Sequence, residues 1–222
     1  MERVLVICAH PDDEVLGLGG TLALHSMKKD NIAILIVADG ETSREIHTKI
    51  ESRQKQSIHA CSLLGISDIE FLNYADQKLD SIPLLELTKK IKEKISKFKP
   101  SIIYTHYWND LNADHRRVFE ATSVSSRPYQ DSKIKKILCF ETPSSTEWSF
   151  KNESFNPNLF VNIEKVILQK LNAIKKFKNE LRPFPHPRSI KSIKNRSNYW
   201  GSISGLKYAE PFMIFREIEH VL

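Results

Sequence analysis

Short apolar runs that contain no alternating polar residues are the feature that most constrains the fold of this chain. The clearest runs cover residues 3–9, 33–40 and 101–106, and they are rich in β-branched side chains. Runs of this composition are typical of central strands that are covered on both faces of a sheet. Further strands are predicted over residues 69–74, 134–141 and 212–218.

Helical patterns separate the predicted strands. The predicted helices cover residues 21–29, 49–65, 83–98, 115–126 and 164–181. Strands that alternate with helices predict a doubly wound α/β fold, with a mostly parallel, twisted sheet flanked by helices. The chain of 222 residues has no internal repeat and no low-complexity linker. We therefore expect one domain that spans residues 1–222.

The composition is that of an ordinary globular protein, with 41% apolar and 27% charged residues, and it excludes a disordered chain. The 33 Lys and Arg residues exceed the 27 Asp and Glu residues and give a net charge of +6. Basic stretches such as residues 89–99 and 175–178 are expected to be solvated helix faces. Attraction to an anionic small molecule or to nucleic acid is the alternative. Of these two partners, we expect only a small molecule.

The three cysteines lie in apolar surroundings and none forms a CxxC pair. Cys8, Cys61 and Cys139 are therefore expected to be buried thiols in a reducing compartment. The first ten residues are too short and too early interrupted for a signal peptide, and no apolar run approaches the length of a membrane span. We expect a cytoplasmic protein without a membrane span.

The segment ICAHPDDEVLGLGG crowds one histidine and three carboxylates together where the first strand ends and a helix begins. His10 and Asp13 are three residues apart and can point at one spot, and Asp12 can reach it from another side. A divalent cation would offset the repulsion, and this mixture of ligands suits zinc. A helix N-terminus, which favours acidic residues, is the alternative. From the residues alone, it stays open which aspartate is a metal ligand and which is a base.

Two further polar clusters, residues 39–41 and 106–115, follow later strands. The carboxyl ends of parallel strands lie at one edge of the sheet, so all three clusters are expected to meet in one crevice. A catalytic zinc usually has three protein ligands and one open position. His115 is the expected third ligand, and His106 competes with it.

The glycines of the first segment allow a different prediction. Gly17, Gly19 and Gly20 resemble a phosphate-binding loop, and Asp39 has the spacing of a ribose-binding acid. However, Leu22 occupies the place of the third motif glycine, and the glycines fall inside the predicted helix. Close helix packing is therefore the favoured role. A dinucleotide-binding oxidoreductase remains an alternative function, as does a non-catalytic metal- or ligand-binding protein.

The segments AHPDDEVLGLGGTLA and DLNADHRRV together resemble the LmbE/PIG-L family of zinc-dependent N-deacetylases. The similarity runs from Val4 to about Val118. It implies a Rossmann-like fold and one zinc ion per chain, held by His10, Asp13 and His115. It also implies a small-molecule substrate, an N-acetylated amino sugar or sugar conjugate, with nucleotide-linked sugars among the options. Because related enzymes form dimeric or six-fold assemblies, a homo-oligomer is one expectation for this chain.

The same resemblance implies roles for two further residues. Asp12 would be the general base that takes a proton as water attacks an acetamide carbonyl, and Arg53 would help to bind the substrate. Many family members have His-x-Asp-His in the second motif, but this chain has Asn112 in the place of the first histidine. Asparagine can donate a hydrogen bond to an oxyanion but cannot protonate a leaving group. His186 and His106 are candidates to replace the missing histidine.

Overall fold

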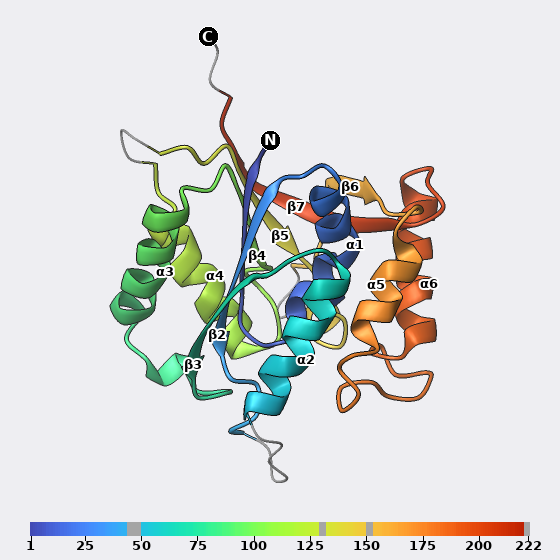
Figure 1. Cartoon of the computed structure of the whole chain (residues 1–222), viewed down its shortest axis with the longest axis horizontal. Coiled ribbons are helices and arrows are strands. Elements are labelled where there is room, and N and C mark those ends of the chain that lie inside the picture. The colour runs from blue at the N-terminus through green and yellow to red at the C-terminus, as the bar shows by residue number, and fades with distance from the viewer. Residues whose placement is uncertain (44–49, 129–131, 150–152, 220–222) are drawn as a thin grey trace.

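The apolar runs form the centre of a seven-stranded sheet in the computed structural model, which describes residues 1–43, 50–128, 132–149 and 153–219 (Figure 1). The strand order is β3-β2-β1-β4-β5-β7-β6. The five strands from β3 to β5 are parallel, and β7 and β6 run antiparallel to their neighbours. The strands are β1 (Arg3–Cys8), β2 (Asn31–Ala38), β3 (Asp68–Tyr74), β4 (Ile102–His106), β5 (Lys136–Phe140), β6 (Leu159–Asn162) and β7 (Ala209–Glu217). The predicted mostly parallel α/β fold is confirmed.

Helices cover both faces of the sheet (Figure 1). One face carries α3 and α4, and the other carries α1, α2, α5 and α6. The helices are α1 (Asp13–Met27), α2 (Ile50–Leu63), α3 (Leu84–Phe98), α4 (Ala113–Ser125), α5 (Ile167–Ile174) and α6 (Ile190–Ile203), with short 3-10 turns η1 (Leu79–Ser81) and η2 (Thr146–Trp148). Lys49, the first residue of the helix predicted over 49–65, lies outside the described residues.

Two apolar layers hold the helices to the sheet. Alternate side chains of a strand point to opposite faces, so β1 contributes to both layers. Val4 and Val6 pack into the layer beneath α1 and α5, whereas Leu5 and Ile7 pack beneath α3 and α4. All three cysteines are buried free thiols, as predicted. No helix within the described part of the chain is both long and apolar enough to cross a bilayer.

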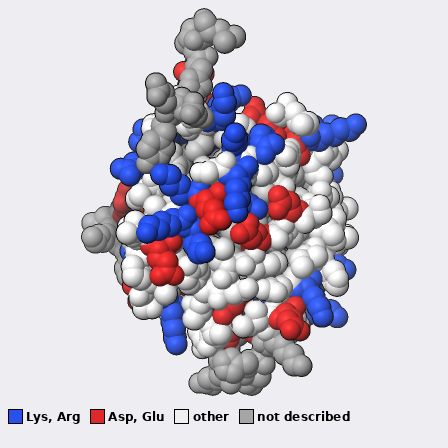
Figure 2. All heavy atoms as spheres, turned by 60° about the vertical axis from the view of Figure 1, so that its left-hand side comes forward, with Lys and Arg blue, Asp and Glu red and all other residues white. Residues whose placement is uncertain are grey.

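The basic helical stretches are mostly solvent-exposed. Lys89, Lys90, Lys92 and Lys97 lie on the outer face of α3. Figure 2 shows basic and acidic side chains intermingled on the side of the molecule that includes this helix. A solvated helix face therefore accounts for this run.

Helix α1 is irregular at Leu18, whose backbone leaves the helical region with φ −141° and ψ 21°. Just beyond this kink, the backbone N–H groups of Gly20 and Thr21 donate to the carboxylate of Glu210 on β7, at 2.8 and 2.6 Å. Glu210 also accepts from Lys170 Nζ of α5 at 2.6 Å, and both charged side chains are buried. One buried ion pair thus joins α1, α5 and β7.

The structure corrects the bounds of two predicted helices and adds one strand and one α-helix that the sequence did not predict. The helix predicted over residues 21–29 is α1, which begins eight residues earlier, at Asp13. The helix predicted over residues 164–181 is only the eight-residue α5, and the chain turns after Ile174. This turn buries Phe177 in the core and brings Glu180 beside Arg53 at the carboxyl edge of the sheet. The unpredicted strand is β6, which precedes residues 164–181 in the chain, and the unpredicted α-helix is α6, which follows them.

Candidate metal centre and active site

The three polar clusters of the sequence meet at the carboxyl edge of the sheet. One ligand atom from each of His10, Asp13 and His115 lies within 4.8 Å of the other two, and all three residues are buried. His10 follows β1, Asp13 begins α1, and His115 lies in the first turn of α4. The topology therefore brings together residues that are more than 100 positions apart in the chain.

Hydrogen bonds fix the orientation of the His115 ring. Its Nδ1 lies 3.0 Å from Asp110 Oδ1, and this carboxylate also accepts hydrogen bonds from Ser145, Thr146 and the backbone N–H of Asn112. With Nδ1 engaged, the other ring nitrogen points at Asp13, with 3.5 Å between Nε2 and Oδ2. When one nitrogen of an imidazole donates a hydrogen bond to a carboxylate, the other nitrogen carries the lone pair that can bind a metal ion.

His10 is held in the same way but with its nitrogens exchanged. Its Nε2 lies 3.0 Å from both Asp114 Oδ2 and Asp76 Oδ1, which leaves Nδ1 facing Asp13 Oδ2 at 3.4 Å. Asp114 in turn accepts the backbone N–H groups of Gln77 and Leu79. Both histidines therefore direct one nitrogen at the same aspartate while a second carboxylate holds the other nitrogen.

The residues of this cluster fit a metal ion. Asp13 Oδ1 and His115 Nε2 are buried atoms without a hydrogen-bond partner among the described residues. Unpartnered buried polar atoms are costly, and a cation between them would remove that cost. Nitrogen and carboxylate ligands of this kind suit zinc. A second group that could hold a cation, His10 with Asp76 and Asp114, has its Asp114 carboxylate already bonded to backbone N–H groups.

The charges of the cluster shift the pKa values of its members. Burial opposes protonation of His115, but the carboxylates of Asp13 and Asp110 outweigh it and raise the pKa to about 9. Burial likewise disfavours charge on Asp110, yet the neighbouring His115 lowers the pKa of this carboxyl to about 2. The two carboxylates thus favour the protonated form of His115. A histidine must be unprotonated at the nitrogen that binds a metal, so a metal ion would displace that proton.

His106, the competing third ligand, is placed differently. Its Nε2 lies 3.4 Å from Asp13 Oδ2 but accepts the backbone N–H of Ala9 at 2.8 Å. Its ring stacks on His115 with 3.9 Å between the centroids. Burial, together with the charge of His115, lowers the pKa of His106 to about 4. A neutral His106 therefore packs against His115, and its Nε2 is occupied by the main chain.

Asp12 has a strained backbone at the start of α1. Its φ of 129° is unusual for a residue with a side chain, and such conformations cost about 1–3 kcal/mol. The backbone N–H of Asp12 donates to Glu14 Oε2 at 2.9 Å, and Glu14 also accepts from Ser57 Oγ. Burial raises the pKa of Glu14 to about 7, although the Ser57 hydrogen bond opposes this shift. Glu14 therefore helps to hold the main chain of Asp12 in place.

The Asp12 carboxylate lies between two guanidinium groups. Arg53 Nη2 donates to Asp12 Oδ2 at 3.0 Å, and Arg188 Nη1 donates to the same oxygen at 3.1 Å. Burial raises the pKa of Asp12, and the charges of Arg188 and Arg53 partly offset this shift. Arg53 was predicted to bind the substrate, but its side chain is only 2% exposed and also pairs with Glu180.

Asn112 caps helix α4. Its Oδ1 accepts the backbone N–H of Asp114 at 2.8 Å, as expected for an N-cap residue. The side chain is half-buried beside the metal cluster. Because Oδ1 is used by the cap, Nδ2 is the atom that could donate a hydrogen bond to a substrate.

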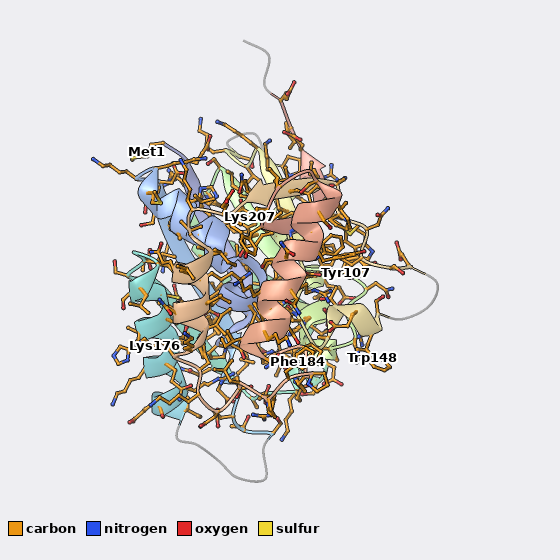
Figure 3. The ribbon with its side chains drawn as sticks, turned by 90° about the vertical axis from the view of Figure 1, so that its right-hand side faces the viewer. Met1, Tyr107, Trp148, Lys176, Phe184 and Lys207 are labelled. Atoms are coloured by element: carbon orange, nitrogen blue, oxygen red, sulfur yellow. The ribbon has the colours of Figure 1, made fainter. Side chains whose placement is uncertain are left out.

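His186 lies on the connection between α5 and α6 and is exposed. Its Nδ1 accepts the backbone N–H of Arg188 at 3.0 Å, and no hydrogen bond or ion pair between described residues joins its ring to the metal cluster. Figure 3 shows this connection, marked by Phe184, below the first turn of α6. Sequence analysis missed Arg188, which lies two residues after His186 and reaches the site from the same connection.

The glycines of the first motif serve packing. A Cβ atom on Gly17 would lie 2.4 Å from the Phe140 side chain, and one on Gly20 would lie 2.7 Å from Ile163. Asp39 Oδ1 is occupied by the backbone N–H groups of Glu41 and Thr42. This geometry does not favour a dinucleotide-binding site.

The comparison with protein families decides the assignment. The family model PIG-L, described as GlcNAc-PI de-N-acetylase, matches residues 5–125, which are more than half of the chain. The chain belongs to the PIG-L family. The match covers both motifs of the metal cluster and ends at the last residue of α4. The resemblance predicted from the two motifs is confirmed.

Two relatives extend beyond the residues that the PIG-L model matches. The uncharacterized deacetylase YaiS of Escherichia coli is 32% identical over 182 residues, which cover 79% of this chain and 90% of that protein. The diacetylchitobiose deacetylase of Thermococcus kodakarensis is 26% identical over 222 residues, covering 95% of this chain and 82% of that protein.

A solved structure supports the fold over the whole PIG-L family chain. The crystal structure of a conserved protein from Thermus thermophilus matches with a TM-score of 0.79 at 24% identity. The match covers 100% of this chain and 98% of that one. At this level of identity, the similarity bears on the fold alone.

Proposed function

We propose that this chain is a metal-dependent N-deacetylase that hydrolyses the acetamide group of an N-acetylated amino sugar or sugar conjugate. The observation that carries the proposal is a pair of buried atoms, Asp13 Oδ1 and His115 Nε2, which have no hydrogen-bond partner among the described residues, with Asp12 next to Asp13 in the chain. Membership of the PIG-L family and the deacetylase activity by which the Thermococcus relative is named support the reaction and the class of substrate. We also propose that the whole chain, residues 1–222, acts as one domain.

His10, Asp13 and His115 would hold the cation, with zinc as the expected metal and one ion per chain. When bound there, a divalent cation acts as a Lewis acid and makes water nucleophilic near neutral pH. Asp110 holds His115, and Asp114 holds His10, by hydrogen bonds to the ring nitrogens that face away from Asp13. These carboxylates keep the two imidazoles in the orientation that a metal requires.

Asp12 would move the protons of the reaction. Both of its arginine hydrogen bonds end on Oδ2, and none of those between described residues ends on Oδ1. Oδ1 is therefore suited to accept a proton from the attacking water and to return it to the leaving amine. Asn112 Nδ2 would donate a hydrogen bond to the acetyl carbonyl oxygen, which becomes an oxyanion as water adds to the carbonyl carbon.

The direct test is acetate release from N-acetylated sugars by the purified, metal-loaded protein. N-acetylglucosamine, diacetylchitobiose and a nucleotide-linked N-acetyl sugar form a suitable first set. Release of acetate together with a free amine supports the proposal. If the metal-loaded protein turned over none of a broad panel of N-acetylated sugars, the proposed function would be wrong.

We expect His115→Ala to lose most of the bound metal, because it removes one of three protein ligands. His106→Ala is the matched control, since His106 is equally buried and its Nε2 is as close to Asp13 Oδ2, at 3.4 Å, but this nitrogen already accepts the backbone N–H of Ala9. Metal content per folded chain, measured by elemental analysis, checks both variants. Loss of metal from the His106 variant and retention in the His115 variant would reverse the ligand assignment.

Variants of Asn112 separate its cap from its contact with substrate. We expect Asn112→Ala and Asn112→Asp to lower turnover by about 10²–10³-fold, because both remove the Nδ2 donor. Only the alanine variant should also lose about 1 kcal/mol of stability, because aspartate retains the capping oxygen. Asn112→His should recover activity at least in part. Unchanged turnover of the aspartate variant would show that the oxyanion is held elsewhere, and His186 would be the next residue to test.

A further inference from the structure

Four charged side chains, three of them buried and one partly exposed, form a closed ring beside the metal cluster. Arg53 pairs with Asp12 at 3.0 Å and with Glu180 at 2.7 Å. Arg188 Nη1 lies 3.1 Å from Asp12 Oδ2 and 3.1 Å from Glu180 Oε2, which closes the ring. The ring contains two positive and two negative groups, and each guanidinium contacts both carboxylates of the ring. Arg53 Nε also lies 3.9 Å from Glu41 Oε1, outside the ring.

Arg188 is anchored on both sides of its guanidinium group. Its Nε donates to Ser144 Oγ, on the connection after β5, at 2.8 Å, while Nη1 reaches the two carboxylates. Its side chain is 21% exposed, whereas that of Arg53 is 2% exposed. Arg188 therefore forms the outer wall of the ring and Arg53 the inner wall.

Both arginines donate to the same oxygen of Asp12, and this selectivity has a chemical consequence. A carboxylate with one free χ2 rotation can exchange its two oxygens, so a base that must meet one water molecule has to be held. Two donors on Oδ2 fix the plane of the carboxylate and leave Oδ1 as the oxygen that accepts the proton. The strained main chain of Asp12 does not by itself set this rotation.

From this geometry we infer that Arg188, held by Glu180 and Ser144, is a positioning residue for the general base Asp12. It acts through the Oδ2 clamp rather than by binding substrate. Glu180 and Arg188 both lie beyond residue 125, where the family match ends. The inference rests on the proposed deacetylase function. It means that residues from the C-terminal part of the chain orient the side chain that transfers the protons.

The test compares Arg188→Ala with Arg182→Ala in steady-state deacetylation. Arg182 is the matched control, because it lies on the same connection and, within the described part of the chain, donates only to the main-chain carbonyls of Asn179 and Leu181. We expect Arg188→Ala to lower kcat by about 10–10²-fold with KM nearly unchanged, and Arg182→Ala to leave kcat unchanged. Arg188→Lys should retain more of kcat than the alanine variant, since an ammonium can still pair with Asp12.

A double mutant distinguishes positioning from general structural support. If Arg188 acts through Asp12, Arg188→Ala should cause little further loss of kcat in the Asp12→Asn background. Guanidinium at a concentration well below that which unfolds the protein should restore part of kcat to the Arg188→Ala variant and not to the Arg182→Ala variant. If Arg188→Ala does not fold, Arg188→Met keeps the length of the side chain and takes its place.

Several outcomes would overturn the inference. A large rise in KM with unchanged kcat would make Arg188 a substrate-binding residue. Additive losses in the double mutant would show that it does not act through Asp12. Failure of the proposed function is distinguishable from both, because in that case the wild-type chain itself would release no acetate.

Discussion

Replacing Asp12 with asparagine should lower the turnover of deacetylation by about 10²–10⁴-fold while the metal stays bound. Asparagine keeps the size and shape of the side chain but lacks a basic oxygen. His10, Asp13 and His115 are untouched by the change, and their ligand atoms remain within reach of one another. Metal content and the rate of acetate release, measured on the same preparation, check both parts of the expectation.

Asp13→Asn is the matched comparison, because it changes the neighbouring carboxylate in the same way. Asp13 faces both proposed histidine ligands, and its Oδ1 has no hydrogen-bond partner among the residues that the structure describes. Its replacement should therefore weaken metal binding first. Excess metal should then restore part of the activity. If Asp12→Asn shed its metal while Asp13→Asn kept it, the two roles would be reversed. Full activity of both variants would favour a purely structural role for these acids at a helix N-terminus.

Replacing Glu210 with alanine should lower the free energy of unfolding by about 3–5 kcal/mol. The change leaves the buried ammonium of Lys170 without its carboxylate, and it removes the acceptor for the backbone N–H groups of Gly20 and Thr21 at the kink of α1. An uncompensated buried charge is among the largest single causes of instability. Equilibrium unfolding in urea measures the effect, with the slope of the transition as a check on two-state behaviour.

Glu217→Ala is the control for this measurement. Glu217 lies on the same strand and pairs with Lys136, but both side chains are about a third or more exposed, so the loss should stay below about 1 kcal/mol. Adding Lys170→Met to the Glu210 variant should recover part of the lost stability, because it removes the unpaired charge. Equal losses for the two glutamate variants would contradict the importance of the buried pair.

The strands could be predicted from the sequence because a buried parallel strand needs apolar side chains on both faces. All six predicted strands are present. The direction of β7 could not be predicted, because an apolar run has the same composition whether the strand pairs parallel or antiparallel with its neighbour. Helix α6 was missed for a different reason. Its buried positions include Ile193, Ser197 and Gly201 at helical spacing, and two of these three residues are not apolar.

Apart from Arg53, which the family resemblance implied, the residues of the site could be predicted only where they lie close together in the sequence. His10, Asp12 and Asp13 form one short motif, and His115 belongs to a second motif that also contains Asp110 and Asp114. Asp76, Glu180 and Arg188 reach the site as single residues from separate segments. Nothing in the local sequence distinguishes such a residue from an ordinary charged side chain on the surface. Tertiary structure was needed to find them.

The order of the strands also determines how copies of this molecule can meet. The two edges of the sheet are β3 and β6. The first carries the charged side chains of Asp68 and Glu70 and is irregularly paired near its end, and the second is only four residues long. Charged, irregular or short edges are poor templates for a strand from another molecule. Association between copies should therefore proceed through side chains on the helices and loops, and the native protein should resist assembly by sheet extension.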